Sequence, residues 1–174
     1  MEEIEDTPSI REAAQVQERL WRGDGFAGLV DAVARDGDPG THAVVEASRA
    51  KVATLPADVI SRELVRRTTL TRQWRQFLTR YPVLLLPVSA ELPFPDNLDM
   101  QGNEGFERVW EAQLTMRALP AMGLPGLVVS TGLVGSVPVG VQFVAGHYRE
   151  DLCLLAGKAI EARGTPPSPI DPVV

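Results

Sequence analysis

The chain has 174 residues, of which 44% are hydrophobic and 23% are charged. These fractions are typical of a soluble globular protein, and the length suits one domain or part of a larger one. The net charge of -6 argues against a nucleic-acid partner, because no basic excess is present to neutralise a phosphate backbone. No apolar run reaches the roughly 18 residues of a membrane span, so we also expect no membrane partner.

Cysteine and histidine usage limits the metal and redox chemistry. Cys153 is the one cysteine, which excludes an internal disulfide and a cysteine-rich zinc site and fits a cytoplasmic protein. His42 and His147 lie far apart in the sequence. A site made of carboxylates alone stays open, although no residue pattern indicates one. The acidic N-terminal stretch has no apolar region typical of a signal peptide.

Residues 6–80 are predicted to be helical. Ser9 can cap the first helix, with Glu12 reaching back as a capping box, and Gly23 ends it. Further helices are expected over 26–37, 41–54 and 58–80, with a turn at 38–40. In the longest helix Leu70, Trp74, Phe77, Leu78 and Tyr81 share one face. Five of its arginines are interpreted as a solvated face, namely Arg62, Arg66, Arg67, Arg72 and Arg75.

Residues 81–164 change to a strand-rich pattern. The apolar run 83–86 indicates a strand buried on both faces, and a long loop and a helix around 106–118 follow it. A second strand is expected at 126–130. Strand, helix and strand in this order predict a parallel crossover. A third strand at 139–145, after a short loop at 132–138, is expected to be antiparallel to the second. A helix from Arg149 to Gly164 comes last.

The predicted fold class is therefore α/β, with helices flanking a small mixed β-sheet. The chain is predicted to be a single domain or a partial domain, with a helical segment at 6–80, a strand-rich segment at 81–164 and an extended tail at 165–174. Three strands cannot hide both edges of a sheet, and an exposed apolar edge invites pairing with another chain. We therefore expect either a partner or a larger sheet.

Three stretches then become recognisable: YPVLLLPVSAELPFP, LPAMGLPGLVVSTG and SVPVGVQFVAGHYREDLCLLAGKAIEARG. Their order and spacing resemble the amidase signature family of C–N hydrolases, most closely over residues 81–164. Ser130 is a departure, since many members have proline there. By this resemblance the fold is the C-terminal part of the amidase fold, needing no metal and no organic cofactor.

The family's catalytic serine pair and lysine have no counterpart in this chain. No two of its serines are adjacent, and Lys51 and Lys158 each lie inside a predicted helix. The resemblance therefore implies the C-terminal portion of an amidase that releases ammonia or an amine from a small-molecule amide, inactive by itself, with no catalytic residue of its own. Ser89, Ala90 and Thr131 are the residues expected along its substrate channel, although turn residues at strand ends explain them equally well.

The partner implied by this interpretation is the N-terminal amidase portion or a second copy of the chain. The alternative is a non-catalytic assembly or binding module that pairs through an exposed sheet edge. Two other sites are less favoured. Ser89 or Ser136 with His147 and Asp151 would make a formal triad, but no G-x-S-x-G elbow supports it. Asp96 and Asp99 are interpreted as loop residues. Gln142, in an apolar strand, is expected to form a structural hydrogen bond.

Overall fold

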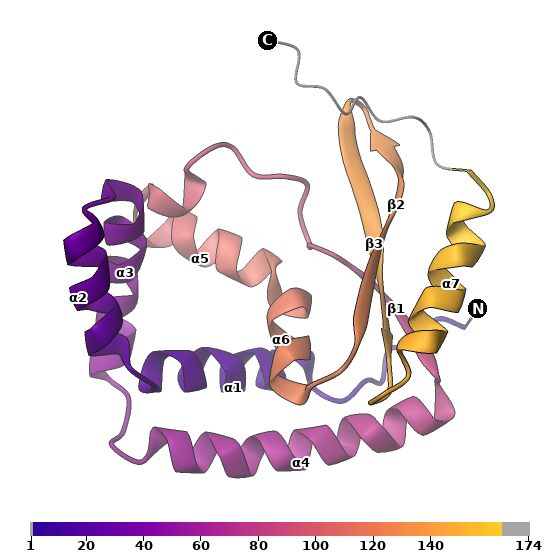
Figure 1. Cartoon of the computed structure of the whole chain (residues 1–174), viewed down its shortest axis with the longest axis horizontal. Coiled ribbons are helices and arrows are strands. Elements are labelled where there is room, and N and C mark those ends of the chain that lie inside the picture. The colour runs from indigo at the N-terminus through magenta and orange to yellow at the C-terminus, as the bar shows by residue number, and fades with distance from the viewer. Residues whose placement is uncertain (1, 165–174) are drawn as a thin grey trace.

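The computed structural model describes residues 2–164, in which seven α-helices and one short 3-10 helix surround a three-stranded sheet (Figure 1). This arrangement confirms the α/β class. The extended tail predicted at 165–174 lies outside the described residues. In chain order the elements are α1 (Ile10–Gly23), α2 (Phe26–Asp36), α3 (Pro39–Ala53), α4 (Val59–Arg80), β1 (Val83–Pro87), η1 (Leu98–Met100), α5 (Gly102–Ala112), α6 (Leu114–Met122), β2 (Gly126–Val134), β3 (Val137–Ala145) and α7 (Glu150–Glu161).

The first helices begin at side-chain caps. The Ser9 hydroxyl accepts a hydrogen bond from the Glu12 backbone N–H at 3.1 Å, as the sequence predicted. The turn expected at 38–40 is instead the start of α3. The Asp38 carboxylate accepts from the Thr41 N–H at 2.6 Å, and Pro39 occupies the first helical position, where no backbone donor is needed. That backbone hydrogen bond lowers the pKa of Asp38.

The helix expected around 106–118 is two helices, α5 and α6, which meet at Gln113. The break changes the chain direction, so that α5 packs against α3 and η1 while α6 packs against α1 and α4. A single straight helix would leave one of these apolar faces without a partner. Helical periodicity alone does not reveal the break, because it records which residues are apolar and not what they pack against.

The sheet has the order β1-β3-β2, and both of its pairings are antiparallel. The antiparallel pairing of the second and third strands is confirmed. The prediction of a mixed sheet with a parallel pair is wrong. β1 and β2 run in the same direction, but they are not neighbours because β3 lies between them. As an edge strand β1 is also less buried than expected, with Leu85 41% exposed.

The β2–β3 hairpin is longer than the sequence indicated. The two strands extend to a two-residue turn, Gly135–Ser136, in which Gly135 has a φ of 63°. Residues 132–134, 137 and 138, expected in the loop, belong to the strands. A β-bulge interrupts the register between Ser130 and Gly132. Bulges bend and twist the strand that carries them, and this one lies where the hairpin extends away from the helices (Figure 1).

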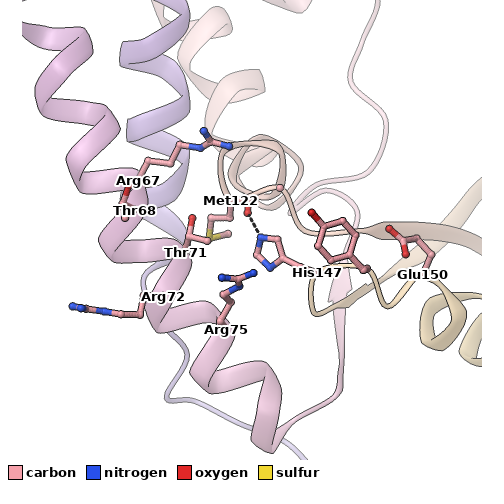
Figure 2. A pocket seen from close by; sticks show the side chains of 10 residues that line it. Arg67, Thr68, Thr71, Arg72, Arg75, Met122, His147 and Glu150 are labelled. Atoms are coloured by element: carbon pink, nitrogen blue, oxygen red, sulfur yellow. Dashed lines mark hydrogen bonds between the residues drawn. The ribbon is translucent and has the colours of Figure 1, made fainter.

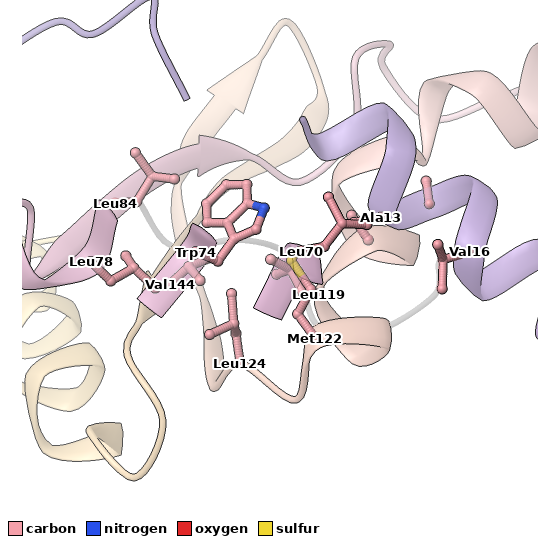
Figure 3. Close-up of a cluster of buried hydrophobic side chains, with 12 residues drawn as sticks. Ala13, Val16, Leu70, Trp74, Leu78, Leu84, Leu119, Met122, Leu124 and Val144 are labelled. Carbon is pink, nitrogen blue, oxygen red and sulfur yellow. The ribbon is translucent and has the colours of Figure 1, made fainter. Parts of the chain in front are cut away.

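The two faces of the sheet belong to two cores. On one face α7 packs against Val129, Phe143 and Ala145 through Cys153 and its neighbours. The other face contributes Leu84 and Val144 to a larger core with α1, α4 and α6, in which Trp74 is fully buried (Figure 3). Helical residues from the first half and strand residues from the second half thus share one core. None of the described helices combines the length and apolar composition needed to cross a bilayer.

Gly140 of the P-V-G-V-Q stretch gives a direct test of this packing. A Cβ at this position would lie 2.7 Å from the Val129 carbonyl oxygen, a backbone atom of the neighbouring strand. We expect Gly140→Ala to lower the free energy of unfolding by about 1–3 kcal/mol, because the strands must separate to admit the methyl group. Urea unfolding of the full chain measures the change.

The matched control is Gly28→Ala, at the third position of α2, where an added Cβ meets nothing within 4 Å. There alanine should stabilise the helix by up to about 1 kcal/mol. Equal unfolding midpoints for the two variants would contradict this account of the hairpin.

Candidate functional site

The three predicted channel residues lie at strand β2 and just after strand β1. Ser89 is half-buried, and its hydroxyl accepts a hydrogen bond from the Glu91 N–H at 3.2 Å. Ala90 is exposed, and its N–H donates to the Ala112 carbonyl at 2.9 Å. Thr131 was expected after the second strand but lies within β2, at the bulge, where its hydroxyl is 3.4 Å from the Val139 carbonyl.

The strand register brings these residues to the same end of the sheet. Pro87 pairs with Val141, and Val141 pairs with Val129. Ser89 comes two residues after Pro87, and Thr131 comes two residues after Val129. The two residues therefore leave the same level of the sheet on opposite sides of β3. Neighbouring strands are about 4.8 Å apart, so two strand spacings, roughly 10 Å, separate β1 from β2. The register thus sets Ser89 and Thr131 near one level of the sheet, and no hydrogen bond joins them in the described residues.

A hollow of about 400 Å³ lies beside the end of β1 and includes Ala90 in its wall. Its charged groups are already paired. Arg108 binds the Glu91 carboxylate through two nitrogens, at 2.7 and 3.0 Å, and Arg11 pairs with Glu111. These partners hold the pKa values of both carboxyl groups below their ordinary range. Both carboxylates therefore stay ionised at neutral pH and act as ion-pair partners.

Among residues 2–164 neither lysine forms a hydrogen bond with Ser89 or Thr131. Lys51, in α3, pairs with Glu107 and lies 3.6 Å from Glu18, and Lys158 is exposed on α7. Among the described residues, no serine hydroxyl is hydrogen-bonded to a lysine or histidine nitrogen. The arrangement of these residues therefore gives Ser89 no base that would activate it as a nucleophile.

The formal triad does not assemble either. His147, in the turn between β3 and α7, is 2.9 Å from the Met122 carbonyl through Nε2. Asp151 instead accepts two hydrogen bonds from Arg149, at 2.8 and 2.9 Å. Ser136 lies in the turn between β2 and β3, at the end of the sheet that is opposite to His147. Asp96 and Asp99 lie in the loop before η1 and at η1, and no group of side chains suited to a metal ion occurs in the described part of the chain.

Gln142 departs from its prediction. Its side chain is 2% exposed, in the middle of β3, yet Oε1 has no hydrogen-bond partner among residues 2–164. The expected structural hydrogen bond of this oxygen is thus not formed. A buried amide oxygen without a donor costs free energy. Gln142 is therefore a polar group of the central strand that the described residues leave unsatisfied.

A buried charged cluster between α1 and α6 was missed by the sequence analysis. Glu18 pairs with Arg22 and lies 3.6 Å from Arg117, and the two arginines are 7% and 9% exposed. Both guanidinium groups lie over the Trp110 ring, with Cζ 5.5 and 4.3 Å from its centroid. Burial lowers the pKa of each arginine, and Glu18 opposes that shift. The aromatic face and one carboxylate thus hold two buried cations.

Comparisons with known proteins bear on about half of the chain. Over 93 residues, 53% of the chain, it is 40% identical to an indoleacetamide hydrolase of Bradyrhizobium japonicum. It is 30% identical over 95 residues to the A subunit of the glutamyl-tRNA(Gln) amidotransferase of Desulforudis audaxviator, and 29% identical over 102 residues to that of Archaeoglobus fulgidus. The aligned segment spans about a fifth of these curated relatives, at 20%, 19% and 20% of their length. No protein-family model matches the chain.

The Glu18 cluster gives a prediction for stability. Glu18→Gln removes the carboxylate that lies within 4 Å of both buried arginines, so that Arg22 and Arg117 keep only the weaker influence of Glu107 and Glu111. We expect the free energy of unfolding to fall by ~3 kcal/mol, since breaking a buried pair strands its partner. Urea unfolding monitored by tryptophan fluorescence measures the loss, and Trp110 reports the cluster directly.

The control for this experiment is Glu46→Gln, which breaks the exposed pair of Glu46 and Arg49 within α3. Exposed pairs contribute little to stability, so its unfolding midpoint should match that of the unaltered chain. If Glu18→Gln behaved in the same way, the cluster would not be stabilised by its carboxylate.

Proposed function

We propose that this chain is the C-terminal part of an amidase-type hydrolase, which cleaves carboxamide C–N bonds to a carboxylate and ammonia or an amine. The observation that supports it most is the 40% identity over 93 residues to an indoleacetamide hydrolase. The similarity to the two amidotransferases adds a second group of relatives whose names refer to amide chemistry. Under this proposal the cytoplasm is the site of action, and the reaction needs no cofactor.

The role of this part is to complete the sheet and form one wall of the substrate channel. Ser89, Ala90 and Thr131 are the residues proposed to face the small-molecule amide. Their support is the strand register, which places the ends of β1 and the bulge of β2 at one end of the sheet. An exposed alanine and two hydroxyls suit contact with a substrate better than proton transfer, because none of the described residues places a base beside them.

The reacting groups would come from another part of the enzyme. In this proposal the N-terminal amidase portion supplies the nucleophilic serine, the second serine and the lysine. Amide hydrolysis needs both an activated nucleophile and donors for the developing oxyanion. The chain by itself should therefore be inactive.

A second candidate function is a non-catalytic module that assembles through the β2 edge. Residues 126–145 contain no charged side chain, and Val128 and Val134 of β2 are 50% and 52% exposed. Edge strands are usually protected from pairing by charges or prolines. This unprotected edge suits a strand from a second copy or from the N-terminal amidase portion.

A chimera tests the amidase proposal. The segment of the Bradyrhizobium japonicum enzyme that aligns with this chain is replaced by the chain's own residues, and ammonia release from indoleacetamide is measured. We expect the folded chimera to hydrolyse the amide, because a scaffold of the right shape restores the channel wall. The purified chain alone should release no ammonia above a mock preparation.

Two outcomes would contradict the amidase proposal. One is a chimera that matches the parent enzyme in circular dichroism and thermal melting yet releases no ammonia. The other is hydrolysis by the purified chain that persists through repeated chromatography. In an active chimera, Ala90→Trp should raise KM with kcat retained, since it narrows the channel, whereas Lys158→Ala, at an exposed position of α7, should change neither.

The edge-pairing candidate predicts association of the chain in solution. Val128→Lys adds a charge to the exposed face of the edge strand, so it should shift the species seen by analytical ultracentrifugation toward the monomer. Leu155→Lys, on the exposed side of α7, is the control and should leave the distribution unchanged. A chain that is monomeric before any substitution would rule out pairing between copies.

A further inference from the structure

The arginines of α4 divide into two groups. Arg62 pairs with Asp58 and Arg66 pairs with Glu12, each at 2.6 Å. Arg67, Arg72 and Arg75 form no ion pair with any other described residue. The sequence analysis interpreted all five as a solvated face. The structure shows instead that the second group borders a hollow.

This hollow has a volume of about 610 Å³ and lies between α4, the end of α6 and the turn that precedes α7 (Figure 2). Figure 2 shows the Arg75 guanidinium pointing toward His147, while the Arg72 side chain extends away from it. The Arg67 Nε donates to the Ala121 carbonyl, which fixes that guanidinium at the rim and leaves its other nitrogens as donors. Guanidinium groups from more than one turn of α4 therefore line this cavity.

One nitrogen of the His147 ring is left without a partner. Its Nε2 is 2.9 Å from the Met122 carbonyl, and since a carbonyl can only accept, Nε2 carries the proton. Nδ1 is buried and has no hydrogen-bond partner within residues 2–164.

The turn that carries His147 is strained. Tyr148 has a φ of 61°, a left-handed conformation that is uncommon for residues other than glycine. The Tyr148 side chain is 86% exposed, so burial of its ring does not compensate for the strain. Strained residues held in place by their surroundings concentrate at ligand sites, and this one lies directly beside the unpartnered imidazole nitrogen.

We propose that this hollow binds the phosphate group of a small phosphorylated molecule, through Arg75 and Arg67. Guanidinium groups bind phosphate oxygens through paired hydrogen bonds. A phosphate offers these two groups more acceptor oxygens and more negative charge than a carboxylate does. The volume exceeds that of a phosphate alone and lies within the range of small-molecule sites. The hydroxyl of Thr71, which also lines the cavity, adds a further donor.

The charges that face His147 favour this binding. Arg67 and Arg75 line the cavity from α4, the Arg72 side chain on the same helix extends away from His147, and among the described residues Glu150 is the one carboxylate that lines the cavity. In Figure 2 Glu150 lies on the opposite side of His147 from the arginines.

The test is a titration of the full chain at constant ionic strength, followed by ¹H–¹⁵N NMR and isothermal calorimetry. The probes are inorganic phosphate, glucose 6-phosphate, sulfate and acetate. We expect both phosphate probes to bind and acetate to bind more weakly. Arg75→Gln should weaken phosphate binding about tenfold, the usual effect of losing a charged hydrogen bond. Arg72→Gln, the matched control on the same helix, should change it less than about twofold.

Two further measurements complete the test. One distinguishes a phosphorylated molecule from free phosphate as the ligand, and the other measures the contribution of the His147 ring. Tighter binding of glucose 6-phosphate than of phosphate supports a phosphorylated molecule as ligand, whereas equal binding supports recognition of the phosphate group alone. His147→Gln keeps a donor for the Met122 carbonyl, so the phosphate affinity of this variant measures what the imidazole adds to the site. Equal losses in Arg72→Gln and Arg75→Gln, or no saturable binding of either phosphate probe, would overturn the proposal. Circular dichroism confirms that each variant is folded.

Discussion

The arrangement of this molecule depends on the central position of β3. This strand forms hydrogen bonds with β1 on one side and β2 on the other, and its alternating side chains serve two cores. Phe143 and Ala145 face α7, while Val144 faces the larger core of α1, α4 and α6. Where both faces are covered and both edges are paired, water cannot solvate a charged side chain, which is why this strand carries none.

Because β3 is the central strand, β1 and β2 form the two outer edges of the sheet. Neither edge is paired within the described residues, and β2 in particular exposes apolar side chains and carries no charged residue. The unsatisfied oxygen of Gln142 in the central strand has the same origin, since the described residues around it offer no donor. Both features are what a portion of a larger hydrolase would present, and both also suit a module that pairs with another chain.

The sequence predicted the candidate site in part. The strand ends that carry Ser89 and Ala90 were found from apolar runs bounded by prolines, a local signal. The position of Thr131 inside β2 was not predicted, because the bulge at this position depends on the register of β2 with β3. The Glu18 cluster and the cavity beside α4 were also missed. Each joins residues that are distant in the sequence, such as Glu18 with Arg117 or Arg75 with His147, and no local pattern records such a meeting.

Local patterns by themselves determined the α/β class, the Ser9 cap, the limits of α4, and the antiparallel hairpin of the last two strands. These features follow from neighbouring residues, through helical periodicity, capping and the short link between strands. The tertiary structure decided the strand order, the break between α5 and α6, and the division of the α4 arginines into paired and unpaired groups. Those features depend on which surfaces that are distant in the sequence come into contact. Chain order suggests that β1 and β2 are neighbours, but β3 lies between them and pairs with both.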